Sequence, residues 1–153
     1  MKAGENEMKP MIVVADSARA RVFTTGETNS ELHEIEVLVH PEGRMHDREI
    51  SSDLPGKEGG VPGGGAHAYE SQTDPKDYEL KSFSRRVANY VEDVRKANGL
   101  SRLLLIAAPK FLGALRSQLS SETREKIIFE QDKNLTQHSV DELQGYLPKP
   151  YKH

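Results

Sequence analysis

Residues 102–108 read Arg-Leu-Leu-Leu-Ile-Ala-Ala, and this stretch decides the fold of the chain. Its continuous apolar run is typical of a strand that is buried on both faces of a sheet. The segment Met11–Val14 has the same character. A long helical pattern precedes residues 102–108, and strands that are joined through a helix usually run parallel with a right-handed crossover. We therefore predict that these two buried strands are parallel members of one sheet.

The crossover helix is the most clearly marked element of the sequence. Asp74 and Pro75 are preferred residue types at the N-cap and at the first helical position. Asn98-Gly99 is a typical helix end, because glycine readily adopts the left-handed conformation. Between these signals, apolar residues recur at helical spacing, namely Leu80, Phe83, Val87, Tyr90, Val91 and Val94. The pattern predicts an amphipathic helix from Pro75 to Asn98.

The first third of the chain predicts an antiparallel meander. A turn at Asp16-Ser17-Ala18 separates the first strand, Met11–Asp16, from a second strand at Arg19–Thr25. The turn-forming run Gly26–Ser30 leads to a third strand at Glu31–His40, which we expect to have one polar face. The apolar residues of this third strand are Leu32, Ile35, Val37 and Val39.

The last third of the chain predicts a helix, a helical turn and one more strand. Pro109 can open a short helix, and either Ser120 or Ser121 can cap the helical turn that follows. Glu122 and Glu125 lie near the positive end of that turn. Lys126–Gln131 is predicted to be the last strand.

A terminal helix is predicted at Val140–Leu147, with Ser139 as its N-cap. The element order is then β-β-β-α-β-α-β-α. This order predicts an α/β fold with a mixed five-stranded sheet and helices on both faces, as in ribonuclease H-like folds. We expect a single domain over residues 11–147, a disordered lead-in over residues 1–10 and a C-terminal tail over residues 148–153.

Composition narrows the class of protein. Hydrophobic residues make up 35% of the chain and charged residues 29%, and the net charge is −3, which argues against a wholly basic nucleic-acid binder. The absence of cysteine excludes a disulfide framework, a thiolate metal site and a cysteine nucleophile. The sequence has neither a long apolar run nor a secretion signal, so we expect a cytoplasmic protein that is not embedded in a membrane.

A glycine-rich stretch interrupts the domain. Residues 40–73 have no sustained periodicity, and residues 55–66 hold half of the chain's 12 glycines. Glycine loses the most backbone freedom on folding, so stability does not explain this cluster. Two interpretations remain open. The stretch is either a displayed loop whose backbone N–H groups cradle phosphates or a flexible bridge without a ligand.

Several motifs resemble a bacterial family described as required for attachment to host cells. They are Val14-Ala15-Asp16-Ser17-Ala18-Arg19-Ala20, the tract from Gly65 to Glu70, Asp74-Pro75, and Ala107-Ala108-Pro109-Lys110-Phe111-Leu112-Gly113. The resemblance covers the chain from about Met11 to Tyr146. The sequence has no export segment, so the resemblance implies an indirect effect on attachment.

The element order also resembles the middle domain of eukaryotic and archaeal peptide release factors. Residues 53–60 stand where those domains carry their Gly-Gly-Gln loop, and residues 103–113 are similar to the strand and turn that follow. In this chain, however, Val61 follows Gly59-Gly60 and Ala66 follows Gly64-Gly65. Peptidyl-tRNA hydrolysis is therefore not predicted, and the resemblance implies an RNA- or translation-related role without catalysis.

The candidate binding residues lie in the glycine-rich stretch and at the start of the long helix. They are Lys57, Gly59, Gly60, Gly63, Gly64, Gly65, His67, Tyr69, Lys81 and Arg85. The basic members could contact RNA phosphates, and an exposed Tyr69 or Tyr78 could stack on bases. Acidic residues are interleaved with them, so an ordinary solvated face of mixed charge is the alternative.

Two other functions remain as alternatives. A protein–protein interaction module would explain an indirect effect on attachment. A metal-dependent nuclease of ribonuclease H-like fold would use Asp16 at the end of the first strand. No acidic partner for it stands at Ala107-Ala108-Pro109, however, and an Asx turn is the simpler role for Asp16.

His40, His46 and His67 form no metal-binding motif and are interpreted as solvated. We thus predict no catalytic residue, metal or cofactor, a partner that is RNA, a ribosome or another protein, and no particular oligomeric state.

Overall fold

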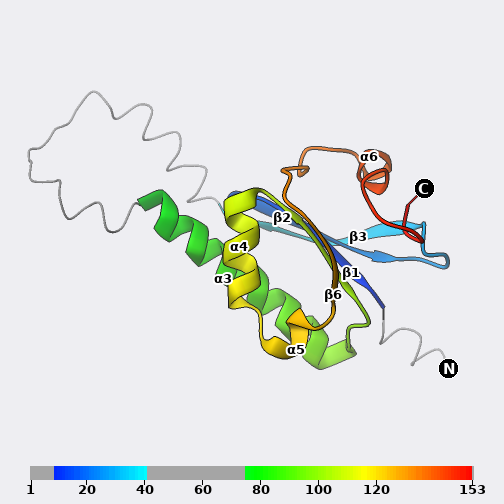
Figure 1. The fold of residues 1–153 in the computed structure, drawn as a ribbon, viewed down its shortest axis with the longest axis horizontal. Coiled ribbons are helices and arrows are strands. Elements are labelled where there is room, and N and C mark those ends of the chain that lie inside the picture. The colour runs from blue at the N-terminus through cyan, green and yellow to red at the C-terminus, as the bar shows by residue number, and fades with distance from the viewer. Residues whose placement is uncertain (1–8, 41–74, 153) are drawn as a thin grey trace, which may run out of the picture.

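The computed structural model describes residues 9–40 and 75–152. Its centre is a five-stranded sheet in the order β3-β2-β1-β5-β6 (Figure 1). The strands are β1 (Met11–Ala15), β2 (Arg19–Thr25), β3 (Leu32–Val39), β5 (Leu103–Ala107) and β6 (Ile127–Gln131). Pairing is antiparallel among β1, β2 and β3 and parallel among β1, β5 and β6. The mixed sheet predicted from the sequence is confirmed.

The parallel pair β1–β5 is the middle of the sheet. Met11 pairs with Leu103 and Ala15 with Ala107, in unbroken register. Every residue of both strands is buried. Such strands need cover on both faces, which explains why both sequences are continuous apolar runs.

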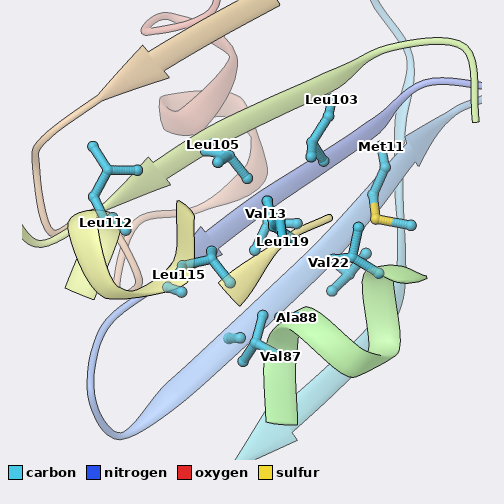
Figure 2. Packing of buried hydrophobic residues seen from close by; sticks show 14 of the residues in the cluster. Met11, Val13, Val22, Val87, Ala88, Leu103, Leu105, Leu112, Leu115 and Leu119 are labelled. Atoms are coloured by element: carbon cyan, nitrogen blue, oxygen red, sulfur yellow. The ribbon is translucent and has the colours of Figure 1, made fainter. Parts of the chain in front are cut away.

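Helices α3 (Pro75–Asn98) and α4 (Pro109–Gln118) cover one face of the sheet. Figure 1 shows both helices on the same side of the strands. Met11, Val13 and Leu105 on the sheet pack against Val87 of α3 and Leu115 of α4 (Figure 2). Gly99 ends α3 with a φ of 83°, as the sequence predicted for this position.

The other face is covered by α6 (Val140–Gln144) and the residues around it. Ile12, Val14 and Leu104 pack here against a cluster that contains Leu135, Leu143, Leu147 and Tyr151. Ser139 caps α6 in a capping box with Glu142, in agreement with the expected N-cap. Helices therefore lie on both faces of the sheet, as predicted.

The C-terminal end differs from the prediction. The terminal helix, expected to reach Leu147, ends at Gln144. The segment expected as a tail is packed, because Tyr151 is only 1% exposed and its hydroxyl accepts a hydrogen bond of 2.8 Å from Arg102. The short α6 covers too little of the sheet, so the residues after it supply the remaining apolar cover.

Strand β3 also departs from its sequence pattern. Ile35, Val37 and Val39 were expected on the apolar side of a half-buried strand, but all three are exposed. A register shift in the pairing with β2 lies between Glu34 and Glu36, and β3 is the edge strand of the sheet. Only Leu32 and Leu38 of this strand pack against the two cores.

A carboxylate fastens α3 to α5 (Ser121–Arg124), a short helix that Ser120 caps. Glu92 accepts hydrogen bonds from the backbone N–H of Ser120 at 2.7 Å and from the Thr123 hydroxyl at 2.9 Å. Arg95 pairs with the same carboxylate at 3.1 Å. Burial favours the neutral acid, but these hydrogen bonds outweigh it and lower the pKa of Glu92 below its ordinary value.

Tyr151→Ala should reduce the free energy of unfolding by about 3–5 kcal/mol, as expected when a buried aromatic side chain is removed from a core. Urea denaturation measures this loss. Tyr78→Ala is the matched control, because Tyr78 is 63% exposed and its removal should change stability by no more than about 0.5 kcal/mol. Equal effects of the two changes would contradict the packing of the C-terminal segment.

Glu92→Gln should cost about 1–3 kcal/mol of stability at pH 7, because Ser120, Thr123 and Arg95 lose a charged acceptor. The pKa of Glu92 is lower in the folded than in the unfolded state. Its contribution is therefore complete above the ordinary glutamate pKa of about 4.3 and is lost as the pH falls through the folded-state pKa. Denaturation curves of both proteins should converge in acid. A difference that stays constant with pH would contradict this role.

Candidate functional site

The predicted binding residues divide into two groups. Lys57, Gly59, Gly60, Gly63, Gly64, Gly65, His67 and Tyr69 lie outside the described residues. Lys81 and Arg85 lie in the first half of α3. The described part of the candidate site is therefore the N-terminal half of this helix and the strand end that contacts it.

Lys81 and Arg85 are exposed one turn apart on α3. Tyr78, 63% exposed, precedes Lys81 by three residues and so lies next to it on the helix surface. We call Tyr78, Lys81 and Arg85 the basic stripe. Phe83 and Val87 lie on the buried side of the same helix. In Figure 1 the first turns of α3 extend past the end of the sheet.

The acidic residues near the basic stripe have other partners. Asp77 lies 3.4 Å from the Lys110 ammonium of α4. Glu79 lies 2.8 Å from His40, and Glu92 is held by Arg95, Ser120 and Thr123. Within residues 9–40 and 75–152, neither Lys81 nor Arg85 makes a side-chain hydrogen bond or ion pair. Both cations are consequently available for a negatively charged ligand.

His40 anchors the end of β3 to α3. Its backbone N–H donates to Ala18 O at 2.8 Å, and its Nε2 lies 2.8 Å from Glu79 Oε1. Its ring stacks on Phe83 with 5.0 Å between the centroids. The interpretation of His40 as a solvated loop histidine was therefore wrong, since only 5% of the residue is exposed.

This anchor places both ends of residues 41–74 at one location. Glu79 is four residues after Pro75, which is about 6 Å along a helix. The chain thus leaves the described fold at His40 and returns to it about one helical turn from the residue that binds His40. The basic stripe begins at the same turn of α3.

Asp16 has a structural role. Its Oδ1 accepts from the backbone N–H groups of Ala18 at 2.8 Å and Arg19 at 3.0 Å, which confirms the expected Asx-type turn. Its Oδ2 accepts from Asn134 at 3.1 Å and from the Thr136 hydroxyl at 2.9 Å. No sequence pattern predicted this second pair of hydrogen bonds. Both oxygens of Asp16 thus bind groups of the protein itself.

Two further features bear on the class of protein. Across the described ranges, no three histidine, aspartate or glutamate side chains are grouped so that they could hold a metal ion. Among the helices of these same ranges, none combines the length and apolar character that a membrane span requires.

The chain is similar to a family model, to a curated protein and to solved structures. A family model described as "Protein required for attachment to host cells" matches residues 11–147. An uncharacterized protein of Rickettsia prowazekii (strain Madrid E) is 37% identical over 78 residues, which are 50% of this chain and 52% of that protein. The chain thus spans about half the length of this curated relative.

Two solved structures are also similar. One is described only as an archaeal protein, with a TM-score of 0.50 and 11% identity. The match covers 95% of this chain and 35% of the archaeal chain. A crystal structure of an archaeal translation termination factor has a TM-score of 0.45 and 9% identity, over 90% of this chain and 34% of that one. The chain corresponds to about a third of each. Because the family model covers almost the whole described fold, the chain belongs to the family of proteins required for attachment to host cells.

Proposed function

We propose that this protein is a non-catalytic binding protein that associates with RNA or the ribosome through the basic stripe and residues 55–66. The observation that carries the proposal is the pair of exposed cations, Lys81 and Arg85, beside an exposed tyrosine. Of their acidic neighbours, Asp77 is paired with Lys110 and Glu79 is hydrogen-bonded to His40. Phosphates and stacked bases are the ligand groups that suit such a surface.

The location of the stripe supports the same proposal. It starts where residues 41–74 rejoin the fold, and we propose that the glycine-rich residues of this segment contact the same ligand. The glycines from Gly59 to Gly65 would then contribute backbone N–H groups, which bind phosphate without a side chain. Lys57, His67 and Tyr69 belong to the same proposed surface.

The family description favours a second candidate, a protein–protein interaction module that affects attachment indirectly. The two candidates differ in their dependence on salt. Binding through phosphates releases counterions and weakens steeply as salt rises, whereas an apolar protein interface changes little. Co-sedimentation with ribosomes over a salt series separates them.

Lys81→Ala combined with Arg85→Ala should weaken association with ribosomes or with single-stranded RNA at low salt. The slope of log affinity against log salt should fall by about 0.7 for each phosphate contact that is lost. The matched control is Lys96→Ala combined with Arg124→Ala, which removes the same charge from exposed positions at the far end of α3 and on α5. Equal losses in both double variants would indicate net charge alone and contradict a specific stripe.

Replacing Gly59, Gly60, Gly64 and Gly65 by alanine should also weaken binding while the unfolding midpoint stays within a few degrees of that of the original protein. Each added Cβ restricts the backbone conformations that close approach to a ligand requires. Filter binding or co-sedimentation measures the affinity, and circular dichroism the fold. Unchanged affinity would mean that these glycines do not contact the RNA. The Lys81 and Arg85 variants would still test the basic stripe independently.

A further inference from the structure

The end of α3 carries a chemically reactive dipeptide. Asn98-Gly99 is the only Asn-Gly pair in the sequence. In such a pair the backbone nitrogen of the glycine can attack the carboxamide carbon of the asparagine side chain. Glycine favours this attack because it has no Cβ to hinder the approach and because its backbone turns freely. Whether the reaction occurs in the folded protein depends on access to the pair and on the backbone conformation.

Both residues are accessible to water. Asn98 is exposed and Gly99 is half-buried. A cavity of about 180 Å³ borders both residues, so water and dissolved bases can reach the peptide group between them. Within residues 9–40 and 75–152, the Asn98 carboxamide makes no side-chain hydrogen bond. No group of the described fold therefore holds this carboxamide in place.

The last turn of α3 protects the pair in the folded state. The Gly99 N–H donates to Arg95 O at 2.9 Å, and Asn98 still belongs to the helix. Side chains of a helix tilt toward its N-terminus, whereas the Gly99 nitrogen lies on the C-terminal side of Asn98. The nitrogen can thus reach the carboxamide carbon only when the last turn opens and its hydrogen bond breaks.

The side chain of Arg95 ties this turn to its surroundings. Its guanidinium lies 3.1 Å from Glu92 on the same helix and 3.3 Å from Glu122 on α5. On the other side of the glycine, Leu100 is only 2% exposed. The exposed residues 96–98 lie between these two fixed points. Helix ends open more readily than helix centres, so the contacts of Arg95 control how often this end opens.

We propose that Asn98 is a site of spontaneous deamidation whose rate is set by the opening of the last turn of α3. The Gly99 nitrogen gives its proton to a base in solution and bonds to the Asn98 carboxamide carbon. The bond from that carbon to the side-chain nitrogen breaks, and the nitrogen takes up a proton and leaves as ammonia. Water then opens the cyclic imide at either carbonyl carbon, which leaves an aspartate or an isoaspartate at position 98.

The reaction consumes only water and requires no oxidant or cofactor. Its site lies at the opposite end of α3 from the basic stripe, and the proposal does not depend on RNA binding.

The products weaken the helix end at which they form. Deamidation adds a negative charge at the C-terminus of α3, where the helix dipole is already negative. An isoaspartate also lengthens the main chain just before Gly99, whose φ of 83° ends the helix. Both products loosen the connection from α3 to the buried strand β5. The protein should therefore accumulate a less stable form as it ages.

The first test compares two exposed asparagines of the same helix. Asn89 is exposed on α3 and is followed by Tyr90, so it serves as an internal control in every sample. The whole chain is incubated in mildly alkaline buffer and mapped by mass spectrometry. Asn98 should convert at least about tenfold faster than Asn89, a ratio that a barrier lower by about 1.4 kcal/mol produces. Equal rates, or no conversion of Asn98, would overturn the proposal.

A pair of variants tests the control by the helix end. Arg95→Gln removes the contacts with Glu92 and Glu122 and should raise the rate at Asn98 by about two- to fivefold, as expected when such ion pairs are lost. Lys96→Gln removes the same charge from an exposed neighbouring residue and should leave the rate nearly unchanged. Unfolding in urea should raise the rate further. A rate that is the same in all of these samples would show that the helix end does not control the reaction.

Discussion

The two-sided burial of the β1–β5 pair is the constraint on which the structure depends. Every side chain of these strands is excluded from water, and alternate residues point into different cores. One core needs α3 and α4, and the other needs α6 with Leu147 and Tyr151. Parallel neighbours also require a long connection between them, and α3 supplies it. The position of the basic stripe follows, because α3 must turn its apolar side to the sheet and its charged side outward.

Features set by local chemistry could be predicted from the sequence. These features depend only on residues that are close in the sequence. They include the apolar runs at Met11–Ala15 and Leu103–Ala107, the glycine that ends α3 and the serines that cap α5 and α6. Features set by distant partners could not. Burial of His40 depends on Phe83 and Glu79, and burial of Tyr151 depends on a face of the sheet formed by other segments. Exposure of Val37 and Val39 depends on β3 being last in the sheet.

The candidate site shows the same division. Lys81 and Arg85 could be placed on the outer side of a helix from periodicity alone. Whether they are neutralised could not be inferred, because acidic residues are interleaved with them along the chain. In space, Asp77 turns to Lys110, Glu79 to His40 and Glu92 to α5. Lys81 and Arg85 have no such partner among residues 9–40 and 75–152.

The burial of Tyr151 links the fold to the direction of protein synthesis. A ribosome makes the N-terminal strands first, and α3, α4 and β5 can cover one side of them before residue 140 exists. The opposite side of β1 and β5 stays exposed to water until Tyr151 has left the exit tunnel. During that interval Ile12, Val14 and Leu104 of the nascent chain form an apolar surface that is exposed to water. Cover for this side of the sheet thus comes from residues that lie far along the chain from β1.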